Sequence, residues 1–215
     1  MVVLDPREIR DAVRRLQAAP PAIFGAQGHL FALNPPLSVA DVVDFERTHR
    51  IELPIDYREF MTNVGNGGAG PYYGVFPLGH MDGTLTQHQV WKSGDGFVGI
   101  LSEPFLLREA WNDLGGKPAD SVADTDEAEY ERQLDEFDEM YWNCWRMNGA
   151  LPICHLGCAM RVWLVVKGDE AGHVWYDRRA DYSGLVPACL RDGSRATFSS
   201  WYAEWLDDAL RALVS

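Results

Sequence analysis

The sequence lacks a long apolar run. No uninterrupted apolar stretch in the 215 residues approaches the roughly 20 that a membrane-spanning helix needs. The opening residues, MVVLDPREIR, carry acidic side chains where a secretory signal has a basic region followed by an apolar one. We therefore expect neither membrane association nor export by the ordinary route, and we expect the protein to be cytoplasmic.

Basic residues are also scarce. Lysine and arginine total 19 against 32 aspartate and glutamate, which gives a formal net charge of −13. A surface of this sign repels the phosphates of nucleic acid. The composition argues against a DNA- or RNA-binding module and favours a protein partner with a basic surface.

The common catalytic motifs are missing. The chain has no GxxxxGKS/T, GxSxG or HExxH pattern, so the P-loop, α/β-hydrolase and zincin classes lose their main support. The glycine-rich stretch 65–74 does not follow a strand and open a helix, as a dinucleotide-binding loop would. We expect a non-catalytic protein. The enzyme alternative is a metal- or cysteine-dependent hydrolase, with Cys158 as nucleophile and His155 or His173 as base.

Cysteine is sparse, and no complete metal motif is present. Cys154 and Cys158 enclose His155 and resemble half of a zinc site, but the second half is missing. His80 and Asp82 with His88 offer three metal ligands, yet the neighbouring glycines explain this segment equally well as a turn. We expect no metal and no cofactor, and we interpret the four cysteines as buried apolar thiols.

Local patterns predict helices at both ends of the chain around a set of strands. Helices are expected from Pro6 to the pair Pro20-Pro21, from Ser38 to His49, from Leu53-Pro54 to Gly65, at 105–111, and from Phe198 to Leu213. Strands are expected at 73–78, and at 160–166 and 173–176 as a hairpin. The length and this pattern predict a single α+β domain with a mostly antiparallel sheet.

Negative charge is concentrated in one segment. Residues 119–140 contain ten acidic residues against the single basic residue Arg132. From Thr125 to Trp142 apolar residues recur at helical spacing, so we expect one helix face to dock on the core and the other to present carboxylates. A solvated acidic helix that aids solubility is one interpretation. Partner recognition is the other, because like charges at i, i+4 destabilise a helix and aromatic residues follow directly.

Aromatic residues are abundant, with eight tryptophans and eight tyrosines. Trp201 and Trp205 have core spacing in the last predicted helix. Trp163 and Trp175 lie on the predicted hairpin, where alternation buries one face and exposes the other. Tyr72 and Tyr73 lie where the glycine-rich stretch meets a predicted strand. We expect one member of each such pair to be available to a partner.

Several motifs carry a family resemblance. LPxDYxxF at 53–60 and GNGGxGPYYGxFPL at 65–78 are followed by LPI at 151–153, LVV at 164–166, GxVWxD at 172–177 and FxxWY at 198–202. In this order they resemble the SUKH superfamily, which includes fungal cell-wall assembly regulators of the Smi/Knr type and many bacterial proteins. The resemblance covers about 38–210, with 119–140 as an acidic insertion.

The resemblance implies an α+β fold with a curved sheet flanked by helices, and no catalytic activity. It also implies two roles, because many bacterial members are inferred to be immunity proteins that neutralise a toxin, often a nuclease, whereas fungal members are regulatory scaffolds. We favour an immunity protein against a basic toxin, since an acidic surface would steer such a partner. The predicted partner-binding residues are the carboxylates Glu127, Glu131, Asp135 and Asp138 and the aromatic anchors Tyr72, Tyr73, Trp142 and Trp145.

Overall fold

The computed structural model describes residues 5–84, 87–91 and 97–214, without the side chains of 82–84 and 87–89. The helices are α1 (Pro6–Ala18), α2 (Val39–His49), α3 (Ile55–Asn63), α4 (Asp120–Ala123), α5 (Glu127–Tyr141) and α6 (Phe198–Arg211), with 3-10 turns η1 (Ala26–Gly28), η2 (Cys144–Met147) and η3 (Arg179–Asp181). The strands are β1 (His80–Thr84), β2 (Gln87–Val90), β3 (Ala150–Gly157), β4 (Met160–Val165), β5 (Val174–Asp177) and β6 (Leu185–Pro187). None of the helices in these ranges is long and apolar enough to cross a membrane.

A four-stranded antiparallel sheet with the order β3-β4-β5-β6 forms the centre of the molecule. The predicted hairpin is confirmed, since β4 pairs with β5 and places Trp163 opposite Trp175. Two register shifts lie along β3, and such irregularities bend a strand. The α+β class with an antiparallel sheet is therefore confirmed. The segment 79–99, which reads as turns, additionally contains the hairpin β1-β2.

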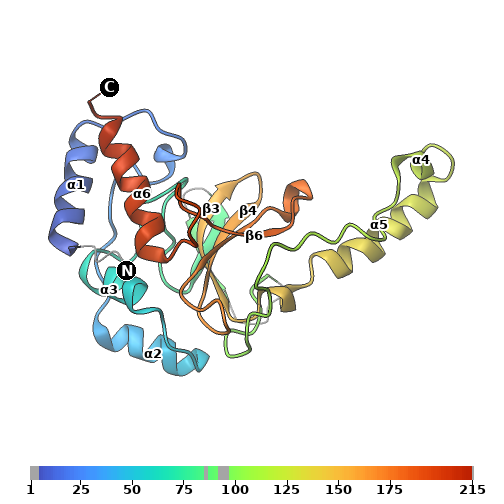
Figure 1. Ribbon diagram of the computed structural model, residues 1–215, viewed down its shortest axis with the longest axis horizontal. Coiled ribbons are helices and arrows are strands. Elements are labelled where there is room, and N and C mark those ends of the chain that lie inside the picture. The colour runs from blue at the N-terminus through green and yellow to red at the C-terminus, as the bar shows by residue number, and fades with distance from the viewer. Residues whose placement is uncertain (1–4, 85–86, 92–96, 215) are drawn as a thin grey trace.

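Helices α1, α2, α3 and α6 gather at one end of the sheet (Figure 1). The predicted stripe of α1 is confirmed, with Ile9, Val13 and Leu16 buried. Side-chain caps explain where the helices begin: Asp5 accepts a hydrogen bond from the amide of Arg7, and both Ser38 and Thr197 form capping boxes. Most of the predicted core face of α6 is likewise buried, whereas Trp205, Leu210 and Leu213 are only partly buried. Helix α6 contacts both α1 and α3, which makes it the centre of the helical layer.

The glycine-rich loop is folded into the core, and the expected strand at 73–78 is not regular. Only Val75 makes bridges, one to Gly68 and one to Cys154. Tyr72 and Gly74 have positive φ angles of 52° and 94°, which break extended structure on the N-terminal side. The loop is nevertheless held firmly, because Tyr202 of α6 donates a hydrogen bond of 2.9 Å to the carbonyl of Ala69.

The helix expected at 105–111 is also wrong. Phe105 forms a parallel bridge with Gly168, and Trp111 forms an antiparallel bridge with Leu185 of β6. The amide and carbonyl of Trp111 exchange two hydrogen bonds of 2.8 Å with Leu185. Pairing with distant strands therefore overrides the local helical spacing. Trp111 adds to the edge of the sheet beside β6, and the Phe105 ring packs against Trp175 on one face.

Gly68 offers a test of how tightly the loop is packed. Its φ is +99°, and an added Cβ would lie 2.3 Å from the carbonyl oxygen of Ala32. Gly116 has a similar φ of +90°, but no atom lies within 4 Å of an added Cβ. We expect Gly116→Ala to cost about 1–2 kcal/mol of unfolding free energy from backbone strain alone. Gly68→Ala should cost about 1–3 kcal/mol more from overpacking. Urea unfolding of both variants measures the difference, and equal losses would contradict a loop packed against Ala32.

Candidate protein-binding surface

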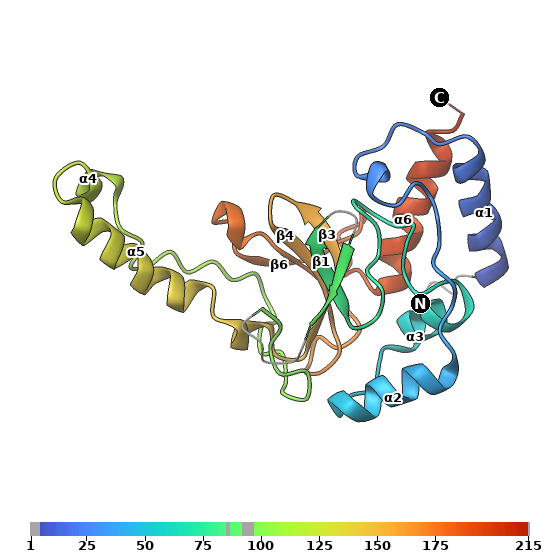
Figure 2. The ribbon, with the colours of Figure 1, turned by 180° about the vertical axis from the view of Figure 1, so that it is seen from behind.

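Residues 112–141, here called the acidic arm, project from the body of the protein. Figures 1 and 2 show α5 leaving the body with α4 at its far end. The predicted helix is confirmed, but only its C-terminal turns dock on the body. Phe137 and Tyr141 are buried there, and Tyr141 contacts the rings of Trp111 and Tyr182. The expectation that a whole face docks on the core holds only for this end of α5.

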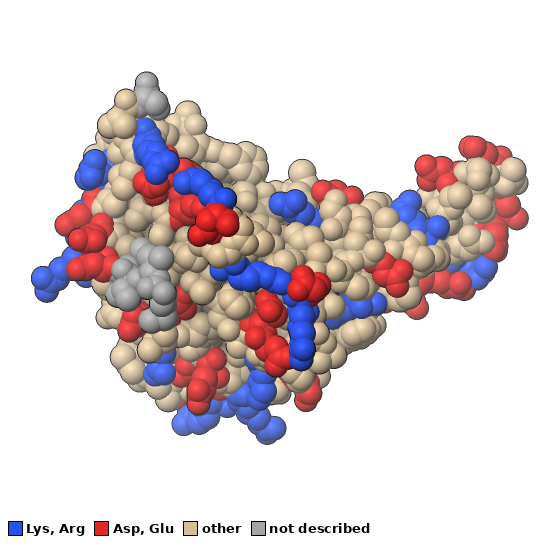
Figure 3. Space-filling view, viewed as in Figure 1, with Lys and Arg blue, Asp and Glu red and all other residues tan. Residues whose placement is uncertain are grey.

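The four predicted carboxylates form one stripe along the arm. Glu127, Glu131, Asp135 and Asp138 follow each other at spacings of three or four residues, which places them on one flank of α5. None of them pairs with a basic group among the residues that the structure describes. One oxygen of Asp138 is shielded from solvent and also has no hydrogen-bond partner in the described part of the chain. Figure 3 shows acidic side chains along the arm and at its tip.

The opposite flank of α5 is partly neutralised by one basic residue. Arg132 forms ion pairs with Glu129, at 2.6 Å, and with Glu136. The hydrogen bonds from Arg132 lower the pKa of Glu129 to about 2. The two flanks thus differ in what they offer a partner, because uncompensated negative charge remains on the stripe from Glu127 to Asp138.

A buried ion pair holds the base of the arm. Arg179, only 4% exposed, donates to the carboxylate of Asp177 from Nε at 2.9 Å and from Nη2 at 2.7 Å. Its Nη1 donates to the carbonyl of Tyr141 at 3.1 Å. Tyr141 is the last residue of α5, where a cation is favoured by the helix dipole. Asp177 belongs to β5, so this pair links the sheet directly to the arm.

Exposed tryptophans surround this base. The ring of Trp142 is 5.1 Å from the Arg179 guanidinium, and Trp145 lies 4.5 Å from the guanidinium of Arg146. Trp142 and Trp145 are 38% and 48% exposed, which leaves both available for contact. Trp142 also lines a hollow of about 250 Å³ together with Trp163 and Arg179. The predicted carboxylates and these two tryptophans therefore lie on one continuous part of the molecule.

Tyr72 and Tyr73 lie elsewhere. Tyr72 packs edge-on against Tyr176 at 6.4 Å between ring centroids, whereas the hollow beside Trp142 is lined by Asp177. Tyr176 and Asp177 are successive residues of β5, so their side chains point to opposite faces of the sheet. The sheet thus separates Tyr72 from Trp142 and Trp145. Tyr73 packs against Phe24 and His155, with its ring centroid 5.5 Å and 5.2 Å from theirs.

The expectation of one exposed tryptophan on the hairpin is wrong. Trp163 and Trp175 are 2% and 0% exposed. They share one sheet face, and the segment around Phe105 covers it, with the Phe105 and Trp175 rings 5.0 Å apart. Strand alternation alone cannot reveal that both sheet faces are covered.

The candidate metal ligands are placed as follows. Within the described residues, no group of three or more His, Cys, Asp and Glu side chains is arranged to hold a metal ion. Cys154 is buried as expected, with Sγ 3.2 Å from the carbonyl oxygen of Pro71. The expectation of buried thiols is wrong for Cys158 and Cys189, which are exposed, and Cys144 is only partly buried. His80 Nδ1 lies 2.9 Å from the carbonyl oxygen of Leu78. The side chains of Asp82 and His88 lie outside the described residues.

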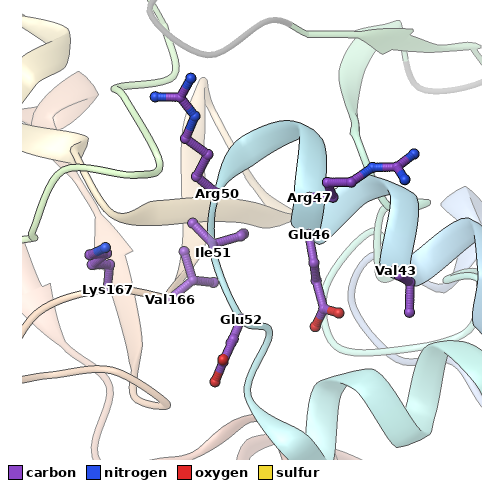
Figure 4. A pocket seen from close by; sticks show the side chains of 8 residues that line it. All are labelled: Val43, Glu46, Arg47, Arg50, Ile51, Glu52, Val166 and Lys167. Atoms are coloured by element: carbon purple, nitrogen blue, oxygen red, sulfur yellow. The ribbon is translucent and has the colours of Figure 1, made fainter.

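One hollow involves residues that the sequence did not single out. About 600 Å³ of space lies beside the end of α2 and the end of β4 (Figure 4). Charged side chains of both signs line this hollow: Arg47, Arg50, Lys167, Glu46 and Glu52. Because the lining carries both signs of charge, it favours no single class of ligand. The two segments are far apart in sequence, so no local motif indicates this hollow.

Comparison of the sequence with models of known protein families identifies the family of this chain. The model of the SMI1/KNR4 family (SUKH-1) matches residues 36–201. The chain belongs to the SMI1/KNR4 family. The match spans the glycine-rich loop, the acidic arm and the start of α6, which confirms the resemblance drawn from the loop motif. Searches among curated proteins and among solved structures give no significant match for this SUKH-1 chain.

The ion pair at the arm base yields a stability prediction. Arg179→Met leaves the Asp177 charge buried without a partner, which should cost about 3–5 kcal/mol of unfolding free energy. The double variant Asp177→Leu/Arg179→Met removes both charges and should cost clearly less than Arg179→Met alone. Urea unfolding of the single and double variants measures this coupling. Additive losses would mean that the two side chains do not act as a pair.

Proposed function

We propose that this SUKH-1 protein is a non-catalytic protein-binding module that acts in the cytoplasm as an immunity protein, and that it neutralises a toxin with a basic surface, such as a nuclease. The observation that carries the proposal is the stripe of four carboxylates on a projecting arm, unpaired within the described residues. Membership of the SMI1/KNR4 family supports a role in protein–protein interaction.

The charge and shape of the arm suit recognition of a basic partner. A toxin that acts on nucleic acid needs Lys and Arg on its own surface to hold phosphate. Complementary charge raises the association rate, and the effect falls as salt screens it over about 8 Å at physiological ionic strength. Because the stripe projects from the body, a partner can approach it without meeting the rest of the surface. Occupying the basic surface of the toxin would also exclude its substrate.

The tryptophans at the arm base supply the short-range part of the contact. Charged pairs at the rim of an interface set the association rate, whereas buried aromatic anchors contribute most of the affinity. Trp142 and Trp145 are exposed beside the stripe, and the hollow of about 250 Å³ next to Trp142 can accept a partner side chain. Tyr72 packs against Tyr176 on the other side of the sheet and is not part of this contact.

The second candidate function is a regulatory scaffold of the cell-wall-assembly-regulator type, which the family membership supports equally. A scaffold would gather several cellular proteins, whereas an immunity protein has one dominant basic target. Affinity capture at low and high salt separates the two. One basic partner that is lost at high salt supports immunity, and a set of structural or signalling proteins supports the scaffold.

The charge stripe can be tested by binding kinetics with the basic partner that affinity capture recovers. We expect the quadruple variant Glu127→Gln/Glu131→Gln/Asp135→Asn/Asp138→Asn to associate about tenfold or more slowly at low salt, because steering accounts for roughly 10–10³ in rate. Its association rate should also depend less on salt. Surface plasmon resonance over a salt series measures both effects.

The matched control removes the same charge from the body of the protein. Glu8, Asp11, Glu59 and Glu103 are exposed and lie outside the arm, so neutralising them should change the association rate much less than neutralising the stripe. An association rate that the arm variant leaves unchanged, with a verified partner, would overturn the proposed role of the stripe.

A further inference from the structure

An aromatic groove lies on the side of the sheet away from the arm base. It has a volume of about 280 Å³ and is bounded by the segment before η1, the glycine-rich loop, β5 and α6. Five of its lining residues are aromatic: Phe24, Tyr72, Tyr176, Trp201 and Trp205. Ligand pockets for drug-sized molecules are generally about 300–1,000 Å³. A groove of this size accommodates one side chain rather than a nucleotide or a cofactor.

The rings are held in place before any ligand arrives. Phe24 and Tyr72 pack edge-to-face at 6.4 Å, and Tyr72 packs at 89° to Tyr176. Tyr72 has a left-handed backbone with φ of 52°, a conformation that is strained for a residue with a side chain. A Cβ on Gly25 would lie 2.0 Å from the carbonyl oxygen of Tyr72, so only glycine allows the two segments to meet.

Two carboxylates complete the lining. Glu204 and Asp208 are separated by one turn of α6 and line the groove beside Trp201 and Trp205. Arg191 pairs with both of them, with its Nε 3.9 Å from Glu204, and its backbone amide donates to Glu204 at 3.0 Å. The Arg191 side chain is half exposed, so these ion pairs are weak and exchangeable.

This combination matches the chemistry of a cationic side chain. Aromatic faces attract a cation within about 6 Å of the ring, and carboxylates form charge-assisted hydrogen bonds with it. Burial raises the pKa of Tyr176, and the neighbouring Tyr72 raises it further, so the Tyr176 phenol remains neutral. The negative charge of the groove therefore comes from Glu204 and Asp208. The guanidinium of arginine fits best, because its plane stacks on rings while its edge meets carboxylates. A neutral side chain would gain no charge-assisted hydrogen bond from the two carboxylates, and an anionic one would be repelled by them.

We propose that this groove binds one arginine side chain of the basic protein partner, as a contact separate from the acidic arm. The proposal extends the proposed function, since it assumes a basic protein as partner. Phe24 and Tyr72 stack on the guanidinium, and Glu204 and Asp208 accept its hydrogen bonds in competition with Arg191.

The test uses a small probe and does not require the partner. The peptide acetyl-Gly-Arg-Gly-amide is titrated into protein labelled with ¹⁵N, and the indole signals of the tryptophans are followed by NMR. The peptide with citrulline in place of arginine is the control, because citrulline has nearly the same shape without charge. We expect saturable shifts of the Trp201 and Trp205 indole signals at millimolar arginine peptide and much smaller shifts with citrulline.

Three variants test the assignment of roles. Glu204→Gln/Asp208→Asn should weaken arginine-peptide binding roughly tenfold, which corresponds to the loss of about one charge-assisted hydrogen bond. Arg191→Gln removes the competing cation and should strengthen binding. Phe24→Ala should weaken binding without unfolding the protein, because Phe24 is 65% exposed. Glu127→Gln/Glu131→Gln on the arm is the matched control and should leave peptide binding unchanged.

The outcomes separate this inference from the proposed function. Equal shifts with arginine and citrulline, or no saturable shift of these indoles, would overturn the arginine site. Such a result leaves the association kinetics of the arm variant as an independent test. Tighter binding of the matching lysine peptide would also contradict the inference, because it would show a simple charge site without guanidinium stacking.

Discussion

The position of the acidic arm depends on one buried ion pair. Both carboxylate oxygens of Asp177, at the end of β5, accept hydrogen bonds from Arg179. Arg179 also donates a hydrogen bond to the carbonyl of Tyr141, the last residue of α5. Burying two charges is costly unless their hydrogen bonds are satisfied, and here a carboxylate, a guanidinium and a helix end satisfy each other. The same guanidinium faces the ring of Trp142. The sheet, the arm and an exposed aromatic side chain are therefore positioned by a single set of contacts.

Strand geometry then divides the molecule into two faces. Asp177 points toward the arm base and Tyr176 toward α6, because neighbouring residues of a strand alternate. One face consequently supports the carboxylate stripe with its tryptophans, and the other supports the aromatic groove with Glu204 and Asp208. Both faces combine aromatic rings with negative charge. This combination is consistent with the proposed basic protein partner, since each face offers its own separate contact.

Features set by short-range interactions were predictable from the sequence. The helices α1, α2 and α6 begin at the capping residues Asp5, Ser38 and Thr197. The spacing of apolar residues in α5 indicated a helix and a flank that carries the carboxylate stripe. The segment 105–111 was misread because its structure is decided by pairing with Gly168 and Leu185, far along the chain. The same long-range pairing buries Trp175. Arg179 was missed because its role depends on contacts with Tyr141, which no spacing in the sequence brings near.

The difference in ion pairing between the two flanks of α5 is relevant to whether the acidic segment serves only to keep the protein soluble. Unpaired carboxylates add net charge and so aid solubility, but like charges at i, i+4 destabilise the helix that carries them. Arg132 shows that a single basic residue suffices to hold two glutamates, Glu129 and Glu136, on one flank. The other flank has no such residue, and its carboxylates follow one another without a partner among the described residues. Under the proposed function, a basic partner would offset the local cost of the unpaired flank, whereas Arg132 already offsets part of that cost on the other flank.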